Sequence, residues 1–326
     1  MTSIETVTGK GLGVIARKLF EPGEVILSDP VTIYCQRGDN SNISSPSSCQ
    51  ARQIYQQFNR LSTQDRFKIS KLFCLGDRTI LNIFSTNSFT ITSRYCGLFI
   101  KISRINHSCE PNACYNNNGC LEKEVTALRK IFEGEEITIS YITNNWEVRS
   151  IRQEELNCWR FLCSCQVCSF LGEDLGKNDQ TRINLKEVDL TISQFIVDIW
   201  KSLNMSFMLH PNDELMKLNL EIMIKLPDIV KKAGKRLNLL ESLGNQMLLQ
   251  KFAAHLDCLL LLLKARSLGI LCPSEVEAKI DYHGDVVERM ADWNIDWRHN
   301  LCLVVARSYL FNVRWTYATN NAKAVL

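Results

Sequence analysis

The chain has 326 residues, of which 45% are hydrophobic and 22% are charged, a composition typical of soluble globular proteins. A chain of this length can bury a sizeable core and is expected to form two domains. The formal net charge of +3 is too small to indicate nucleic acid or a membrane surface as a partner. The first residues, MTSIETVTGKG, lack the apolar segment of a secretory signal, and the most apolar run, CLLLLL, is far too short to span a membrane. We therefore expect an intracellular protein of the nucleus or cytoplasm.

Cysteine is unusually frequent, with 14 residues, and 11 of them precede residue 170. In a reducing compartment, such cysteines favour metal binding or catalysis over disulfides. Their uneven distribution separates the two halves of the chain.

The N-terminal part is predicted to be rich in β-structure. Residues 1–36 contain the apolar runs GLGVIA and EVIL, and Pro22-Gly23 between them fits the central positions of a type II turn. The Ser/Asn-rich residues 38–50 predict an exposed loop, and residues 51–75 predict a helix. Further strands are expected at residues 89–103, 123–132 and 135–142.

The strand GEEITISYI places alternate side chains on one face. Ile137, Ile139 and Tyr141 share this face. A tyrosine at the end of such a face can be carried into a site by the strand, although a tyrosine on its own is more commonly part of the core.

The C-terminal half has a helical pattern. Residues 171–184, LGEDLGKNDQTRIN, are polar and are interpreted as a linker. Beyond them apolar side chains recur at a spacing of three to four, so residues 185–326 are predicted to be an all-helical domain of about six helices. Ser274 and Glu277, just after Pro273, match a capping box that opens one of these helices. The periodic apolar residues are Val188, Ile192, Phe195, Ile199 and Leu203.

The segment FLCSCQVC contains three closely spaced cysteines, Cys163, Cys165 and Cys168. Three thiols at this spacing can turn toward one ion, and Zn²⁺ favours four thiolates arranged as a tetrahedron. The alternative, three thiols without a metal, would leave a cluster that is readily oxidised. The spacing leaves the fourth ligand open. The candidates for it are Cys109, Cys114, Cys120 and Cys158.

Several ligand-capable groups follow a strand-like run at residues 105–112, which read INHSCEPN. An amide, an imidazole, a hydroxyl and a thiol stand in a row there. Taken singly, His107, Tyr141 and Asn87 are ordinary structural residues, and the GKGLG turn at residues 9–13 lacks the G-x-G-x-x-G fingerprint of a dinucleotide site. Their order along the chain changes this interpretation.

The order is a glycine turn, N-S-F, N-H-S-C-x-P-N, G-E-E-I-T-x-x-Y and C-x-C-x-x-C. In this combination the chain resembles the SET-domain protein lysine methyltransferases. Within them it is most similar to the SET-and-MYND branch, in the forms without a MYND zinc finger that are common in filamentous fungi. The resemblance covers about residues 8–170. It implies an S-adenosylmethionine-dependent enzyme that methylates a lysine of a histone or of another protein.

The resemblance also implies roles for individual residues. Tyr141 corresponds to the tyrosine at the methyl-transfer point, where its hydroxyl orients the target amine. Cys109 is implied as the fourth zinc ligand beside the three clustered cysteines. Trp159 stands in the substrate channel, where many relatives carry Tyr or Phe. The residues implied to bind the methyl donor are Lys10, Gly11, Leu12, Asn87, Asn106, His107, Tyr141 and Phe161.

The implied fold class is α+β. Residues 1–150 would form a β-rich SET domain with a helical insert at about residues 38–80. Residues 151–170 would form a post-SET cysteine segment that holds zinc, and residues 185–326 the all-α domain. The family fold also threads its C-terminal segment beneath a loop as a pseudo-knot.

A second interpretation is favoured by Trp159, which departs from the family pattern, and by the C-terminal half, where the likeness to the family fades. The indole of Trp159 is larger than a phenol and could narrow the channel or close it to lysine. The cysteines between residues 36 and 100 are too scattered for a MYND finger, so target choice would rest on the insert and the helical domain. The alternative function is a SET scaffold used for a small-molecule biosynthetic reaction or for binding. Neither interpretation implies nucleic acid or a membrane as a partner.

Overall fold

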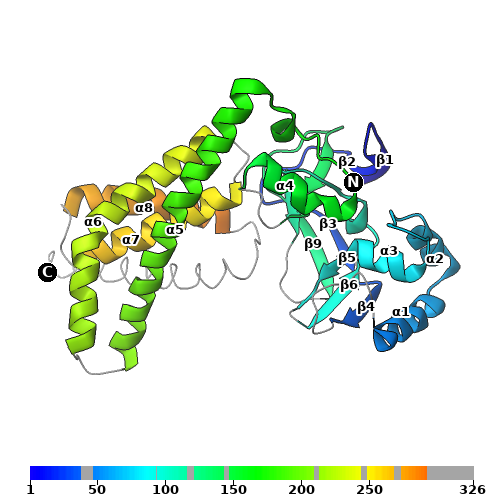
Figure 1. Ribbon diagram of the computed structural model, residues 1–326, viewed down its shortest axis with the longest axis horizontal. Coiled ribbons are helices and arrows are strands. Elements are labelled where there is room, and N and C mark those ends of the chain that lie inside the picture. Colours follow the sequence, from blue (N-terminus) through cyan, green and yellow to red (C-terminus); the bar gives the residue numbers. More distant parts are fainter. Residues whose placement is uncertain are drawn as a thin grey trace, which may run out of the picture. The chain divides into compact units, whose positions relative to one another are not determined.

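The computed structural model describes most of the chain (Figure 1). The described residues are 1–37, 47–92, 94–115, 121–142, 147–208, 213–243, 248–267 and 273–291. They divide into two compact units, each with its own core. Among the described residues, the first unit comprises 1–142 and 152–168, and the second comprises 147–151 and 169–291.

The first unit contains three small sheets within its described part. Their strand orders are β1-β2-β10-β7, β3-β9-β8 and β4-β6-β5. Together with the helices of both units, these sheets confirm the predicted α+β class. The strands are β1 (Thr2–Val7), β2 (Gly11–Ala16), β3 (Val25–Pro30), β4 (Ile33–Gln36), β5 (Ser88–Thr90), β6 (Tyr95–Leu98), β7 (Asn106–His107), β8 (Ala113–Tyr115), β9 (Glu122–Ala127) and β10 (Glu136–Ile139).

A glycine turn joins β1 to β2, which pair antiparallel along their whole length. The Lys10 N–H donates to the Val7 carbonyl at 3.0 Å and closes the turn. Gly9 and Gly11 have φ angles of 75° and 78°, a left-handed conformation that glycine adopts without steric cost. The glycines therefore allow a tight turn with little side-chain cover.

The predicted type II turn between β2 and β3 is confirmed. The Glu24 N–H donates to the Glu21 carbonyl at 3.0 Å across Pro22 and Gly23. Gly23 has a φ of 84°, as the third position of this turn requires.

One strand pairing brings distant segments of the chain together. β7 lies parallel to β10, with Asn106 opposite Thr138 and His107 opposite Ile139. β8 and β9 lie between them in the sequence but belong to another sheet. The strand that leads to Tyr141 therefore runs beside the INHSCEPN segment. The threading of a pseudo-knot at this place stays a prediction.

Asn112, the last residue of INHSCEPN, extends this attachment to β10. Its Oδ1 accepts from the Thr138 N–H at 2.8 Å, and its Nδ2 donates to the Glu136 carbonyl at 2.8 Å. The side-chain amide thus makes the two bonds that a neighbouring strand would make. Asn112 is only 2% exposed, so water cannot replace either bond.

The apolar side chains of these strands form the core of the first unit. Ile137 and Ile139 of β10 are fully buried, and Tyr141 packs against the same cluster. This confirms the predicted inward face of the strand. Burial of each isoleucine contributes about 1.5–3 kcal/mol to folding, which fixes which face of β10 points inward.

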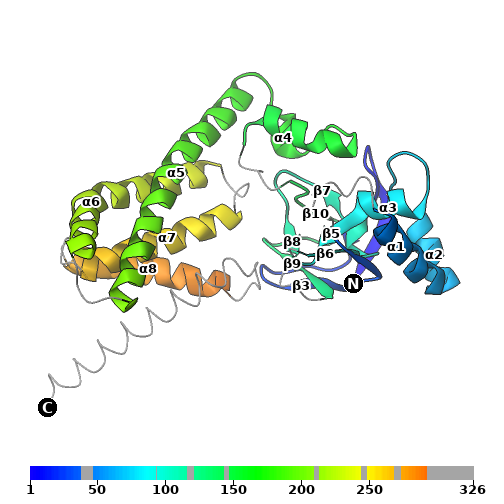
Figure 2. The ribbon, with the colours of Figure 1, turned by 60° about the horizontal axis from the view of Figure 1, so that its bottom comes forward.

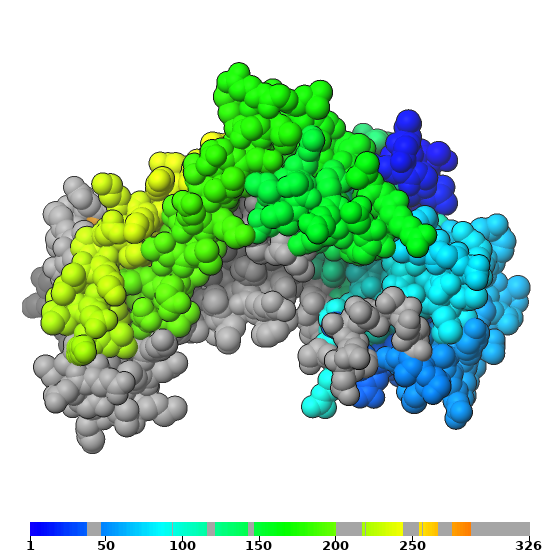
Figure 3. Space-filling model, viewed as in Figure 1, coloured from blue at the N-terminus to red at the C-terminus, as the bar shows by residue number. Residues whose placement is uncertain are grey.

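A helical insert follows β4, where two helices replace the single helix predicted over residues 51–75. Ser62 causes the interruption, because its hydroxyl accepts from the Asp65 N–H at 3.1 Å and caps the second helix. A third helix ends at Asn87 and was not predicted. The helices are α1 (Ser48–Arg60), α2 (Thr63–Ser70) and α3 (Ile80–Asn87), which form part of the surface seen in Figure 3.

The predicted loop at residues 38–50 is tested only in part. Residues 38–46 lie outside the described residues, and from Ser48 onward the chain is helical. Ser47 and Gln50 form a capping box at the start of α1, each side chain bonded to the other's backbone N–H. The end of the predicted loop is therefore a helix start.

Short helical segments also occur between residues 102 and 169. Three of them are 3₁₀ helices, and one precedes β7. They are α4 (Arg149–Leu156) and the 3₁₀ helices Ile102–Arg104, Asn157–Trp159 and Gln166–Ser169.

The second unit is helical throughout its described part (Figure 2). Each helix packs against the next along the chain. The helices are α5 (Gly172–Met208), α6 (Asp213–Ser242), α7 (Leu248–Ser267) and α8 (Pro273–Ala291). The rest of the predicted helical domain, residues 292–326, lies outside the described residues, and none of the described helices is long and apolar enough to cross a membrane.

The prediction of a linker at residues 171–184 is wrong, because α5 already begins at Gly172. Glu173 and Asp174 lie in its first turn, where carboxylates interact favourably with the free N–H groups of a helix. Lys177 forms an ion pair with Glu173 one turn earlier at 2.6 Å. A polar sequence of this kind suits an exposed helix as well as a loop, which is why composition alone misled.

The apolar periodicity of α5 is confirmed. Ile192, Phe195 and Ile199 are buried in the core of the second unit, and Val188 is packed against it. The side chain of Leu203 lies outside the described residues. At the other end of the unit, α8 begins at Pro273, one residue before the predicted cap at Ser274.

We expect Asn112→Ala to destabilise the chain by about 2–4 kcal/mol, because it leaves the Thr138 N–H and the Glu136 carbonyl buried without their partner. The free energy of unfolding would be measured by urea denaturation monitored by circular dichroism. Asn59→Ala, at an exposed amide of α1, is the control and should change it by no more than about 0.5 kcal/mol. Equal effects of the two substitutions would contradict the strand-like role of Asn112.

Candidate functional site

A carboxylate joins the glycine turn to the parallel strand pair. Glu136, the first residue of β10, accepts from Lys10 Nζ at 2.7 Å and from Asn106 Nδ2 at 2.8 Å, one bond on each oxygen. The Asn106 amide also donates to the Leu12 carbonyl at 3.1 Å. A Cβ at Gly13 would lie 2.9 Å from the Asn106 amide nitrogen and 2.9 Å from the Glu136 carboxylate, so only glycine leaves room for this network.

The backbone of the same turn is open. A Cβ at Gly11 would meet no atom within 4 Å, and Leu12 is exposed. The space beside Gly11 is therefore open to a ligand that approaches closely. The glycine turn, which is predicted to bind the methyl donor, therefore lies next to Asn106, which is also predicted to bind it.

Tyr141 is held at both of its ends. Its N–H donates to His107 Nδ1 at 3.0 Å, and its hydroxyl donates to the Ile105 carbonyl at 2.6 Å. Burial, together with the negative charge of Glu136, raises the pKa of Tyr141, so its hydroxyl stays protonated at neutral pH. Because that proton is committed to Ile105, the lone pairs of the oxygen are left to accept a further hydrogen bond.

Both ring nitrogens of His107 face the interior of the protein. Nδ1 accepts from Tyr141, and Nε2 lies 3.4 Å from Cys109 Sγ. Burial lowers the pKa of His107 to about 4, so the imidazole is neutral. A contact between His107 and a methyl donor would therefore fall to its backbone.

Two aromatic side chains from the segment after α4 surround Tyr141. The ring centroid of Trp159 lies 5.4 Å from that of Tyr141, and the ring of Phe161 lies 6.4 Å from Tyr141 and 6.1 Å from His107. Arg160 between them has a φ of 55°, a left-handed conformation that is uncommon outside glycine. This local turn brings both neighbouring aromatic rings to the same tyrosine.

Asn87 occupies a different position from the other predicted residues. It ends α3, and its Nδ2 donates to the carbonyls of Phe73 and Ile83 at 2.7 Å each. Its carbonyl accepts from Ser103 Oγ at 3.2 Å, which ties the insert to the 3₁₀ helix before β7. The amide nitrogen of Asn87 is thus bonded within the insert. A contact between Asn87 and the methyl donor would have to be made by its side-chain oxygen or its backbone.

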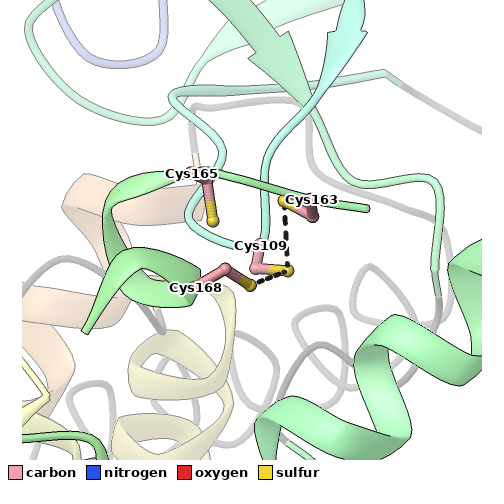
Figure 4. A group of neighbouring side chains, drawn as sticks. All are labelled: Cys109, Cys163, Cys165 and Cys168. Carbon is pink, nitrogen blue, oxygen red and sulfur yellow. Dashed lines mark hydrogen bonds between the residues drawn. The ribbon is translucent and has the colours of Figure 1, made fainter. Parts of the chain in front are cut away.

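Four buried cysteines from two segments point toward one another (Figure 4). Cys109 follows β7, while Cys163, Cys165 and Cys168 belong to C-x-C-x-x-C. The four Sγ atoms all lie within 4.8 Å of one another, with 3.6 Å between Cys109 and Cys168 and 3.9 Å between Cys109 and Cys163. Four sulfurs around a tetrahedral ion, each at about 2.3 Å, would be about 3.8 Å apart. The cluster therefore fits a metal ion.

The other candidates for the fourth ligand do not join this cluster. Cys158 is exposed, and its Sγ donates to the Glu155 carbonyl at 3.2 Å. Cys114 lies on β8, and Cys120 is outside the described residues. Among the described cysteines, Cys109 is thus the one that completes the set.

The electrostatics of the cluster also suit a cation. Hydrogen bonds among the thiols lower the pKa of Cys168 to about 7 and that of Cys165 further, while such bonds raise the pKa of Cys109 and of Cys163. Two of the four cysteines are thus favoured as thiolates. Arg152 is fully buried with Nη2 3.7 Å from Cys168 Sγ. Burial disfavours its charge, but the nearby sulfurs outweigh this effect and raise its pKa. Thiolate is the form in which cysteine binds a metal.

Sequence reasoning assigned no role to Glu136, Asn112 or Arg152. Glu136 and Asn112 lie inside the quoted motifs, so their position was visible, but their partners depend on the strand register. Arg152 had no such signal, because nothing in the sequence around it indicates that it is buried beside the cysteines. All three connect segments that are distant in the sequence.

Comparison with known proteins identifies the fold around this site. Residues 11–142 match the family model of the SET domain, so the chain contains a SET domain, as its motifs predicted. The match begins at Gly11, within the glycine turn, and includes INHSCEPN and Tyr141.

Relatives come from the branch that the motifs indicated. A SET and MYND domain-containing protein of Dictyostelium discoideum is 42% identical over 77 residues, which cover 23% of this chain and 15% of that protein. Histone-lysine N-methyltransferase set5 of Schizosaccharomyces pombe is 28% identical over 193 residues, covering 59% of this chain and 58% of the relative. Human histone-lysine N-methyltransferase SMYD3 is 30% identical over 123 residues, covering 37% and 28%. The chain matches less than two thirds of the length of each of these proteins.

We expect the purified chain to carry about one divalent metal ion, bound by the four cysteines. Cys109→Ser should reduce the bound metal strongly, as measured by mass spectrometry of the metal content, because a neutral hydroxyl is a poor replacement for a thiolate. Cys158→Ser is the matched control and should leave it unchanged. Lowering the pH should release the ion, since protonation of the thiolates competes with the metal. Equal loss from both variants would show that the cluster is not the metal site.

Proposed function

We propose that the chain is an S-adenosylmethionine-dependent protein-lysine N-methyltransferase. The observation that carries the proposal is the placement of Tyr141, whose hydroxyl is fixed on the Ile105 carbonyl while Asn106 and the glycine turn lie on the neighbouring strands. The SET domain match and relatives with methyltransferase names support it.

The donor site would be built from the open turn and the parallel strand pair. The backbone of Gly11 and Leu12, with Lys10, would hold the amino-acid end of the donor, and the Asn106 amide would exchange its present partners for it. Phe161 would stack near the adenine. S-adenosylmethionine supplies a methyl group on a positively charged sulfur, which an amine attacks in line. Asn87 belongs to the proposed donor site only through its oxygen or backbone.

Methyl transfer requires the lysine amine to be neutral and aligned with the methyl group. A free lysine has a pKa of about 10.4, so roughly one amine in a few thousand is neutral at pH 7. The rings of Trp159, Phe161 and His107 around Tyr141 form a weakly polar wall that disfavours the ammonium form. The free lone pairs of the Tyr141 hydroxyl then accept an N–H of the amine and orient it. Alignment of this kind contributes several kcal/mol, and no general base is required.

We propose Zn²⁺ as the metal of the four-cysteine cluster. A buried set of four thiolates without an open position is typical of structural zinc. The ion would pin Cys109, which follows β7, to the post-SET segment that carries Trp159 and Phe161. It would support the site without taking part in the transfer.

The wider assignment follows the same proposal. Residues 1–150 would be the SET domain, residues 151–170 the post-SET segment, and the helices from residue 172 onward the C-terminal domain. Target choice would rest on the insert and these helices. The substrate would be a histone or another protein of the nucleus or cytoplasm, and the histone-lysine N-methyltransferases among the relatives support a histone.

One observation favours a second candidate function. Trp159, rather than a smaller ring, lies against Tyr141, at the place where a lysine would enter. A channel closed by this indole would suit a scaffold that acts on a small molecule or only binds one. Labelling of protein lysines decides between the two functions.

We expect the protein to transfer labelled methyl from S-adenosylmethionine to protein lysines, and Tyr141→Phe to lower kcat by roughly 100-fold, as loss of one preorganised hydroxyl does in other enzymes. Donor affinity, measured by calorimetry, should stay within about twofold, since the donor side of the site is held by Glu136. Tyr55→Phe, at an exposed tyrosine of α1, is the control. Absence of donor binding and of any labelling by the wild-type protein would end the proposal.

We expect Trp159→Tyr to raise the number of methyl groups added to each lysine, because a smaller ring leaves room for a methylated amine. Mass spectrometry of the labelled peptide measures the number directly. Phe132→Tyr, at an exposed ring of the same unit, should leave it unchanged. An identical methylation state in both variants would remove Trp159 from the channel.

A further inference from the structure

The ring of His107 lies between Tyr141 and the four-cysteine cluster. It is 4% exposed and lies between the backbone of Tyr141 and the sulfur of Cys109. Both contacts run through ring nitrogens, on opposite sides of the imidazole. Neither the motif nor the family match assigns a role to this side chain.

The geometry determines which nitrogen carries the proton. The backbone N–H of Tyr141 can only donate, so Nδ1 at 3.0 Å must be the unprotonated acceptor. In a neutral imidazole the proton then resides on Nε2. Nε2 lies 3.4 Å from Cys109 Sγ, so the N–H points at a sulfur of the metal cluster.

We propose that His107 is a positioning residue that couples the four-cysteine cluster to Tyr141: it donates Nε2–H to the Cys109 thiolate while Nδ1 holds the Tyr141 backbone. The part of this inference that concerns methyl transfer rests on the proposed function. The part that concerns the thiolate stands on the hydrogen bonds alone.

The coupling has a physical consequence. A hydrogen bond to a metal-bound ligand fixes its orientation, and its loss typically costs 10–100-fold in metal affinity. Conversely, a metal-bound Cys109 sulfur holds the His107 ring in place. The ring in turn holds the backbone N–H of Tyr141, from which the tyrosine side chain extends. A small displacement of an aligned group slows the reaction strongly. Binding or loss of the metal at the four cysteines therefore changes the position of Tyr141 through the His107 ring.

The amino-acid end of the proposed donor site does not share this connection. Lys10 and Asn106 are held by the Glu136 carboxylate, on the other side of the strand pair. Loss of the metal should therefore lower kcat for methyl transfer by a larger factor than it raises the KM for S-adenosylmethionine, to which Phe161 on the post-SET segment also contributes. Loss of a purely structural metal would lower kcat and raise the KM by similar factors as the fold is lost.

The test compares His107→Phe with His107→Gln in the full chain. Phenylalanine keeps a ring of similar size but neither donates nor accepts, whereas glutamine offers one donor and one acceptor, like neutral imidazole. With cobalt(II) in the cluster, a hydrogen bond lowers the energy of the sulfur lone pairs. We expect the thiolate-to-cobalt absorption band to move to longer wavelength in His107→Phe and to return toward wild type in His107→Gln. Transfer of the metal to a chelator should be about 10–100-fold more favourable for His107→Phe.

The outcomes separate the two parts of the proposal. An unchanged cobalt band and unchanged metal affinity in His107→Phe would overturn the hydrogen bond to Cys109. A changed band with unchanged kcat would overturn the coupling to Tyr141. If the wild-type protein transfers no methyl group, the proposed function fails, and the cobalt spectra still decide the thiolate contact.

A measurement on the wild-type protein covers the case in which His107→Phe does not fold. Metal would be withdrawn stepwise by a chelator while circular dichroism confirms that the fold persists. We expect kcat to fall in parallel with the metal content, with a smaller loss of the donor affinity measured by calorimetry. A kcat independent of the metal content would overturn the coupling.

Discussion

The parallel pairing of β7 with β10 is the constraint on which the site depends. It is a short contact, with two residues of β7 opposite two residues of β10, yet it places INHSCEPN beside the strand that leads to Tyr141. A pairing this short is weak by itself, because few backbone hydrogen bonds form. Asn112 compensates by bonding to β10 through its side chain, and the buried Ile137 and Ile139 keep the register from slipping.

Polar groups inside this region form connected sets, one of them half-buried and the other largely buried. Glu136 joins Lys10 to Asn106, and His107 joins Tyr141 to Cys109. A buried polar group without a partner costs about 1–3 kcal/mol, so such sets are stable only when each member is satisfied. That requirement makes the site rigid, and rigidity is what alignment of two reacting groups demands.

Much of this could be predicted from the sequence, because the chemistry was concentrated in short motifs. C-x-C-x-x-C implied a metal site, and the resemblance selected Cys109 among four candidates; the structure brings that cysteine to the cluster. The partners of Glu136 and Asn112 could not be predicted, since they depend on a strand register that no local pattern contains. The linker prediction failed for a related reason: the charges of residues 171–184 describe an exposed surface, and they do not distinguish a helix from a loop.

Asn106 and His107 are neighbours on one strand, and this explains how two networks meet without merging. Successive side chains of a strand point to opposite faces, so the Asn106 amide reaches the glycine turn and Glu136 while the His107 ring reaches Cys109. The same alternation on β10 separates Glu136 from the residues that lead to Tyr141. The Asn106 side chain thus belongs to the network around Glu136 and the glycine turn, and the His107 side chain belongs to the network around Tyr141. A change that disturbs the thiolates can reach Tyr141 through His107 and leave the donor network in place, because the two share a backbone but no side chain.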